Sequence, residues 1–440
     1  MRGGEIIEKA NHYAIDAEIG RLGIHTFEIQ EGSQKVYSTE GEVFPETSSR
    51  EAYKTVCFRE VVLFFPCDMP FRKSAEKINR MWWRQAKSAQ IRARTIANLV
   101  EREGKQIQEH LNQKAEEILT SNGWGSDGKP TKDEQVCDPI GEQAFLAHEQ
   151  VCAGIEELNA ELPPERRIDV VELHETFEDP KQVRANISLD DVCCKKQKEQ
   201  GRKKGAPPKE KREMVYNTVA HIQNGDSQAY TLNTHNITQM MIIVVAFLIN
   251  NGLMDGTGPF VFFTDGAQDL RKAIESFFAF LPFKIILDWY HLEKKCKDLL
   301  SMAINGKKVK DHVLRELIAW LWLGKTERAV TLLGALSPEQ IKNQKELDHL
   351  IGYLDRHRDC LPCYALRRKL GLRISSNPVE KANDVVVSQR QKHNGMSWSP
   401  DGSLSLATLA AVRRNSQDRH WLRHHDISFQ LSATPDNLAA

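Results

Sequence analysis

The middle of this chain, from about residue 167 to residue 300, is a series of short apolar runs separated by polar turns. Short apolar runs predict strands, and apolar positions three or four residues apart predict helices. The predicted strands are Ile168–Leu173, Val183–Leu189, Met214–Ile222, Ala229–Leu232, Phe260–Thr264 and Lys284–Leu287. The predicted helices are Thr238–Leu253, Leu270–Phe278 and Tyr290–Leu300. Antiparallel strands followed by strand–helix units predict a mixed sheet with helices on its faces, so we expect an α/β fold.

Helical spacing dominates on both sides of this segment. We expect helix around Glu142–Glu161 and a wholly helical stretch from Lys308 to Leu370. The domain boundaries that we predict are 1–125 for an N-terminal helical region, 126–166 for a linker and helix, 167–300 and 371–431 for two parts of one α/β core, 301–370 for an all-α insertion, and 432–440 for a tail.

The N-terminal region carries a possible DNA-binding pattern. A weak amphipathic helix is predicted at Ile6–Ile19 and a short strand at Val61–Phe65. Two basic helices follow, and the second runs from about Ala93 to Ile107. Two short helices separated by a turn are typical of a helix-turn-helix, whose second helix lies in the major groove. A plain helical bundle with solvated arginines fits the pattern equally well. The DNA-contacting candidates near the start of the second helix are Arg92 and Arg94.

Composition adds few constraints. Lys plus Arg and Asp plus Glu number 60 each, so any affinity for nucleic acid must come from local clusters. No uncharged apolar run is long enough to cross a bilayer, and the N-terminus has no signal-peptide core. Nine scattered cysteines favour reduced thiols. We therefore expect a cytoplasmic protein with no membrane segment.

Three carboxylates mark the boundaries of predicted elements. Asp190 ends the strand at Val183–Leu189, Asp265 ends the strand at Phe260–Thr264, and Glu380 lies in the first turn of a late helix. Open α/β sheets bind ligands at the carboxyl ends of their strands. Carboxylate oxygens suit Mg²⁺, and a pair of such ions can clamp both oxygens of a phosphodiester displacement.

Each of these carboxylates also has a simpler interpretation. Either aspartate alone could be a turn residue, and Glu380 could form a capping box with Asn377. Asp191 is a rival to Asp190, because neighbours in a strand point to opposite faces and only one can reach the site. The segment Asp-Trp-Tyr-His (288–291) adds Asp288 and His291 after another strand, where the imidazole could position a phosphate, orient a water or merely cap the helix.

Two basic clusters could contact a DNA backbone. One lies in the loop that follows Asp190, and the other lies downstream of Glu380. Solvated charge is the ordinary interpretation of such clusters. The candidates are Lys195, Lys196, Arg202, Lys203, Lys204, Arg390 and Lys392.

Together these motifs resemble the DDE transposases of bacterial insertion sequences, in the mutator-related branch that includes the ISLre and ISKra groups. The likeness covers about residues 55 to 415. The matching segments are Leu-Asp-Asp-Val (189–192), Thr-Asp-Gly-Ala (264–267), Asp-Trp-Tyr-His (288–291) and Gly-Leu-Arg-Ile-Ser-Ser-Asn-Pro-Val-Glu-Lys-Ala-Asn (371–383). The family commonly has Asp-Gly where this chain has Asp190 and Asp191.

The resemblance implies a ribonuclease-H-like catalytic core interrupted by a helical insertion. It also implies that Asp190, Asp265 and Glu380 bind two Mg²⁺ ions, or Mn²⁺ in their place. The expected activity is cleavage and strand transfer of double-stranded element ends by at least a dimer, associated with the nucleoid. Two alternatives stay open: a catalytically inactive, transposase-derived DNA-binding protein, and a metal-dependent nuclease that does not join ends.

Overall fold

The computed structural model divides the chain into two compact units. Unit 1 comprises Met1–His110, Cys194–Val215 and Val386–Ser428, and unit 2 comprises Leu111–Cys193, Tyr216–Val385 and Phe429–Ala440. For residues 5–17, 20–31, 34–38 and Tyr53 only the backbone is described. The structure describes residues 5–17, 20–31, 34–38, 53–82, 84, 90–131, 144–169, 175–198, 213–225, 228–256, 258–393 and 396–433.

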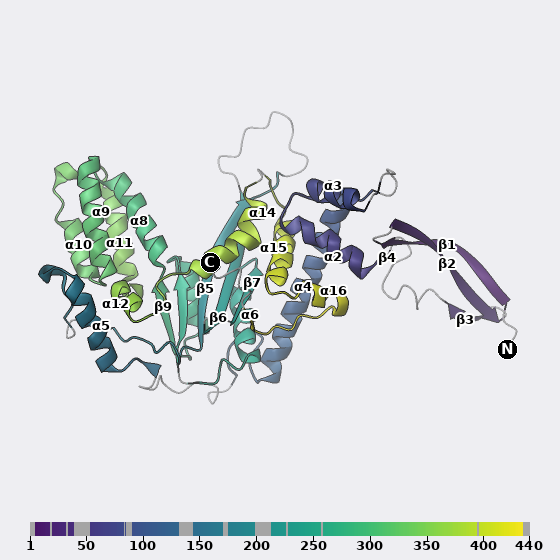
Figure 1. Cartoon of the computed structure of the whole chain (residues 1–440), viewed down its shortest axis with the longest axis horizontal. Coiled ribbons are helices and arrows are strands. Elements are labelled where there is room, and N and C mark those ends of the chain that lie inside the picture. Colours follow the sequence, from purple (N-terminus) through teal and green to yellow (C-terminus); the bar gives the residue numbers. More distant parts are fainter. Residues whose placement is uncertain are drawn as a thin grey trace. The chain divides into compact units, whose positions relative to one another are not determined.

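Unit 2 is built on a six-stranded mixed sheet (Figure 1). The strand order is β10-β7-β6-β5-β8-β9, with β6 antiparallel to β7 and with β5, β8 and β9 mutually parallel. This arrangement confirms the predicted α/β class. The bounds of the strands are β5 (Ala185–Lys195), β6 (Met214–Asn224), β7 (Gln228–Thr234), β8 (Phe260–Thr264), β9 (Phe283–Leu287) and β10 (Ser432–Ala433).

The centre of the sheet is buried on both faces. All five residues of β8 are buried, as expected for a parallel strand covered by helices. Helices α6 (Ile237–Asn250) and α7 (Gln268–Phe277) supply part of that cover, and the ring of Phe278 packs edge-on against Phe260 and Phe262.

A layer of helices follows β9, as the sequence predicts for the stretch up to Leu370. Helices α8 to α11 lie side by side (Figure 1), and their apolar faces form one core with Val261 and Phe263 of β8. The short helix α12 packs against α5 (His148–Glu161). The bounds are α8 (Trp289–Ala303), α9 (Lys307–Trp322), α10 (Thr326–Gly334), α11 (Gln344–Arg356) and α12 (Tyr364–Lys369).

Unit 1 contains a second sheet where the sequence predicts a helix. The predicted helix at Ile6–Ile19 is wrong, because this segment pairs with the next strand in a long antiparallel register. The apolar residues there fit either period poorly, so pairing with the neighbouring strand decides the structure. The sheet order is β3-β2-β1-β4, with β1 (Glu5–Ala17), β2 (Gly20–Glu31), β3 (Gln34–Ser38) and β4 (Tyr53–Lys54).

The helices of unit 1 confirm one prediction and overturn another. The predicted strand Val61–Phe65 is wrong, because it lies largely in α2 (Val56–Phe64), which Thr55 caps through a 3.1 Å hydrogen bond from the Phe58 amide. Helix α3 (Phe71–Met81) precedes α4 (Ala93–Ser121), which begins where predicted but continues for 29 residues. In the part of the chain that the structure describes, no helix has the length and apolar character needed to span a bilayer.

Candidate functional site

The register of the parallel strands brings three aspartates to one level of the sheet. Ser188 of β5 pairs with Phe263 of β8, and Thr264 of β8 pairs with Leu287 of β9. Continuing this register places Asp190 beside Asp265, and Asp265 beside Asp288. The amide of Asp288 donates to the Thr264 carbonyl at 2.8 Å, which continues the alignment beyond the strand ends. Strands stand about 4.8 Å apart, so these carboxylates share one edge.

Asp190 does not end its strand, contrary to the sequence prediction. Strand β5 continues to Lys195, since β6 still pairs with it, whereas β8 ends at Thr264 and β9 at Leu287. Asp190 therefore projects from an uninterrupted strand at the level where its neighbours stop. The prediction that it joins Asp265 at the edge of the sheet does not depend on the strand's end.

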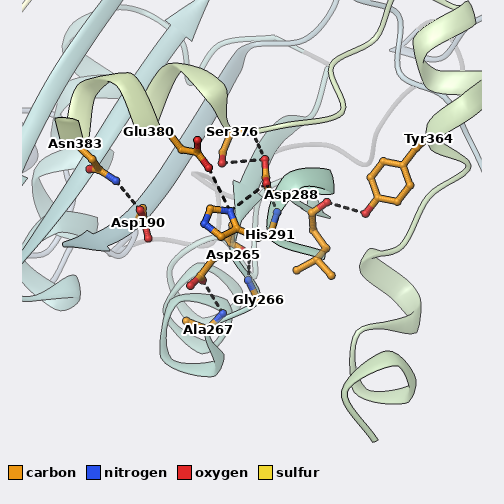
Figure 2. A network of polar contacts seen from close by, with 12 residues as sticks. Asp190, Asp265, Gly266, Ala267, Asp288, His291, Tyr364, Ser376, Glu380 and Asn383 are labelled. Carbon is orange, nitrogen blue, oxygen red and sulfur yellow. Dashed lines mark hydrogen bonds and ion pairs between the residues drawn. The ribbon is translucent and has the colours of Figure 1, made fainter. Parts of the chain in front are cut away.

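The turn after β8 fixes Asp265 by its backbone. Asp265 Oδ1 accepts a 2.8 Å hydrogen bond from the Ala267 amide, which closes the turn into α7. Gly266 has φ of +87°, and a Cβ there would lie 2.7 Å from the Leu287 side chain. Only glycine fits this left-handed, crowded position without strain. Figure 2 shows Asp265 beside the ring of His291.

Glu380 reaches the same edge from helix α13 (Asn377–Asn383). The capping-box alternative is wrong, because the helix starts at Asn377 itself and has no side-chain cap hydrogen bond. Glu380 Oε1 instead lies 3.6 Å from His291 Nδ1. Asn383, three residues on and therefore on the same face, donates from Nδ2 to Asp190 Oδ2 at 2.5 Å. The amide oxygen of Asn383 is buried and has no hydrogen-bond partner.

Asp288 is the buried support of this arrangement. It is fully buried, and its Oδ1 accepts hydrogen bonds from the His291 amide at 2.8 Å and from His291 Nδ1 at 3.0 Å. Its Oδ2 accepts from the Ser376 amide at 2.5 Å and from Ser376 Oγ at 3.0 Å. One carboxylate thus caps α8, orients the imidazole and ties the residue before α13 to the end of β9.

The electrostatics show that these groups act on one another. Burial, with the nearby charge of Asp265, raises the pKa of Asp190 to about 7. Burial also raises the pKa of Glu380. The hydrogen bond to Asp288 raises the pKa of His291. Figure 2 shows Asp190, Asp265 and Glu380 around this ring.

Asp191, the rival first acid, is held differently. Its Oδ1 accepts a 2.6 Å hydrogen bond from Thr218 Oγ1 on β6. The alternation of a strand sends its side chain to the opposite face from that of Asp190. Burial raises the pKa of Asp191 as well. Since Asp190 rather than Asp191 meets the residues of α13, Asp190 is the better candidate for the site.

One group of donor atoms among the described residues has the spacing of a metal site. The ligand atoms of Asp288, His291 and Glu380 lie within 4.8 Å of one another. Asp288, however, already accepts four hydrogen bonds, so its oxygens are committed to the protein. Asp190, Asp265 and Glu380 offer carboxylate oxygens, the ligands that Mg²⁺ prefers. Burial and, after it, the charge of Asp265 raise the pKa of Asp190, and a cation beside these carboxylates would offset the repulsion between them.

The residues predicted to contact DNA differ in their exposure and in their partners. Arg92, Arg94, Lys195 and Lys392 are exposed, and Lys196 forms a 2.5 Å ion pair with Glu213. Arg202, Lys203 and Lys204 lie outside the described residues.

For Arg390 the prediction is wrong. The side chain is buried, its Nε donates to the Pro66 carbonyl at 2.7 Å, and its guanidinium lies between the rings of Phe71 and Trp398. Burial lowers its pKa to about 10. This arginine holds elements of unit 1 together, so its side chain is not available to a DNA backbone.

Sequence reasoning missed Asn383 and Ser376. Asn383 had a usable signal, because it follows Glu380 by three positions in a predicted helix and so had to share its face. Ser376 had none, since its bond to Asp288 joins positions 88 residues apart.

Comparisons with known proteins do not identify a family for this chain. Neither the search of protein-family models nor the search of curated proteins found a match to this chain.

Proposed function

We propose that this chain is a DNA transposase of the DDE type, which cleaves and transfers element ends with Mg²⁺, or with Mn²⁺ in its place. One observation carries the proposal: Asp190, Asp265 and Glu380 come from three separate elements and surround a single imidazole. A carboxylate that only ends a strand or caps a helix has no reason to meet two others. The effect of the Asp265 charge on the pKa of Asp190 and the 3.6 Å contact of Glu380 with His291 support the proposal that the three acids act together.

The architecture of unit 2 supports the ribonuclease-H-like core that the sequence resemblance implies. Strands β6 and β7 are antiparallel, strands β5, β8 and β9 are parallel, and the all-α segment lies between Asp265 and Glu380 in the chain. Exposed Arg92 and Arg94 at the start of α4 remain the residues that we propose for contact with double-stranded DNA. Pairing two ends requires at least a dimer during the reaction.

We propose a separate role for each residue of the site. Asp190, Asp265 and Glu380 would hold two divalent ions, which supply charge neutralisation and an activated water or 3′-hydroxyl. Asn383 fixes one oxygen of Asp190, and the other oxygen would bind an ion. Asp288 holds His291 Nδ1, which leaves Nε2 to bind the scissile phosphate. The protein itself contributes positioning and charge rather than covalent chemistry.

The test is a cleavage and strand-transfer assay with labelled element ends, a target plasmid, and Mg²⁺ or Mn²⁺. We expect Asp265→Asn to abolish cleavage and leave end binding intact. The matched control is Asp269→Asn, which removes an exposed carboxylate four residues away in α7. This control should cut and join normally.

The same assay separates the alternatives. Binding without nicking in the wild-type chain would indicate a transposase-derived binding protein. Cut ends without joined products would indicate a nuclease. Cleavage retained by Asp265→Asn would refute the assignment of the carboxylates.

A further inference from the structure

The first turn of α8 carries an exposed aromatic ring beside the carboxylate site. Tyr290 lies between Trp289, which begins the helix, and His291. The ring of Trp289 packs against other aromatic side chains, 4.6 Å from the ring of Trp322 and 4.9 Å from that of Tyr364. Tyr290, in contrast, is 54% exposed. The start of α8 therefore holds one aromatic ring against the protein and presents the next one to solvent.

The exposed ring of Tyr290 stands next to the imidazole of His291. The centroids of the two rings are 5.9 Å apart, and their planes cross at 83°. One strand of a DNA duplex advances about 3.4 Å per nucleotide, so this separation is shorter than two nucleotide steps. A phosphate bound at His291 would therefore have the base of an adjoining nucleotide within reach of Tyr290.

A lysine lies on the same side of the helix. Lys294 follows Tyr290 by four positions and His291 by three, so it is a neighbour of both on the surface of α8. Lys294 is exposed. Burial raises the pKa of Glu380, and the ammonium of Lys294 is among the charges that oppose this rise. Lys294 is therefore close enough to the carboxylate site to act on it.

An aromatic ring beside a cation is the combination that binds single-stranded DNA. Bases stack on the aromatic ring, and the basic side chain contacts the backbone. Inside a duplex both faces of a base are covered by its neighbours, so a side chain can stack only on a base that has left the duplex stack. A single exposed aromatic residue is ordinary on a protein surface. The position of Tyr290 between a proposed phosphate ligand and a lysine is what gives its exposure a function.

We propose that Tyr290 and Lys294 form a subsite for an unpaired base next to the scissile phosphate. The ring of Tyr290 stacks on this base, and Lys294 contacts a neighbouring phosphate of the same strand. The inference rests on the proposed transposase function and narrows its substrate. The site acts on an element end whose base pair beside the cut has opened.

The experiment measures cleavage by the full chain, at saturating DNA and with Mg²⁺, of fully paired ends and of ends with a mismatch beside the cut. We expect Tyr290→Ala to cleave paired ends about 5- to 100-fold more slowly than the wild type, the range for loss of one base–aromatic stack. Mismatched ends open at little cost, so they should restore most of this rate. Tyr290→Phe keeps the ring and should cleave paired ends like the wild type. Lys294→Gln should lower the slope of log Kd against log salt by about 1.

Two matched controls change exposed side chains away from the site. Met302→Ala removes an apolar side chain near the far end of α8, and Lys308→Gln removes a cation from the start of α9. Both should behave like the wild type. Normal cleavage of paired ends by Tyr290→Ala, in an assay where Asp265→Asn is inactive, would overturn the subsite and leave the transposase proposal standing. A defect of Tyr290→Ala that is equal on paired and mismatched ends would do the same. Absence of cleavage by the wild-type chain would overturn both proposals.

Discussion

Replacing Asp288 by asparagine tests whether one buried carboxylate positions the site. Asp288 accepts four hydrogen bonds, two from His291 and two from Ser376, and none of its surface is exposed. An amide has one acceptor oxygen, so it can satisfy only one of these two pairs. The NH₂ group of the asparagine then faces the donors of the other residue, so hydrogen-bond donors face donors without an acceptor between them.

The cost follows from the groups left without a partner. A buried unsatisfied donor costs about 1–3 kcal/mol, so two donors would cost about 2–6 kcal/mol. Because the Ser376 hydroxyl can rotate to another acceptor, we expect the lower part of that range, about 2–3 kcal/mol. The ring of His291 also loses its anchor. Loss of a supporting hydrogen bond behind a metal site typically reduces activity about 10–100-fold.

Urea unfolding and the cleavage assay measure these two effects. Asp288→Asn should lower the free energy of unfolding and the cleavage rate at saturating DNA, while affinity for DNA ends stays unchanged. The control is Asp298→Asn, which changes an exposed carboxylate on α8, the helix that Asp288 caps. A loss of stability below about 0.5 kcal/mol, the usual range for surface substitutions, would refute the reasoning.

Three further changes probe the neighbouring residues. Asn383→Leu removes the donor to Asp190 and should slow cleavage about 10–100-fold without weakening DNA binding, as gel shift and nicking assays would show. Asp191→Asn should keep most of the activity that Asp190→Asn abolishes, and equal losses in the same nicking assay would reverse this assignment. Glu178 is buried, but hydrogen bonds from Arg367 hold its pKa below the ordinary 4.5. The ion pair therefore stabilises the fold at pH values above 4.5. This contribution is lost as the pH falls through the lower pKa of the folded state. Glu178→Gln should therefore cost about 3–5 kcal/mol at neutral pH and flatten the acid limb of the unfolding curve in urea melts.

The sequence predicts the α/β core well because its strands are strongly apolar. Phe260–Thr264 is found with the predicted bounds, since five consecutive apolar or β-branched residues allow few other structures. The N-terminal strands were missed because their weak pattern is resolved only by pairing between Glu5–Ala17 and Gly20–Glu31. The run Val61–Phe65 is equally apolar, but the cap at Thr55 starts a helix before it.

The three acids of the site were predictable, whereas their supports were largely not. Asp190, Asp265 and Glu380 each lie in a recognisable local pattern. The bond between Ser376 and Asp288 depends on tertiary contact across 88 residues, which no local pattern encodes. Arg390 shows the opposite error: a basic residue in a basic segment looks like a DNA contact until its burial between Phe71 and Trp398 is known.

In this chain the buried carboxylates that support the fold differ from those of the candidate site in how fully they are hydrogen-bonded. Asp288 and Glu178 are buried carboxylates whose hydrogen bonds outweigh the cost of burial, and the pKa of each is lowered. The pKa of Asp190 shifts in the opposite direction. Burial and the neighbouring charge of Asp265 outweigh the interactions that lower this pKa, and they raise it to about 7. The amide oxygen of its partner Asn383 is buried without any acceptor role. Folding alone does not favour a buried carboxylate in this state. The cation that we propose for the site would offset the negative charges of Asp190 and Asp265 and so remove the conflict.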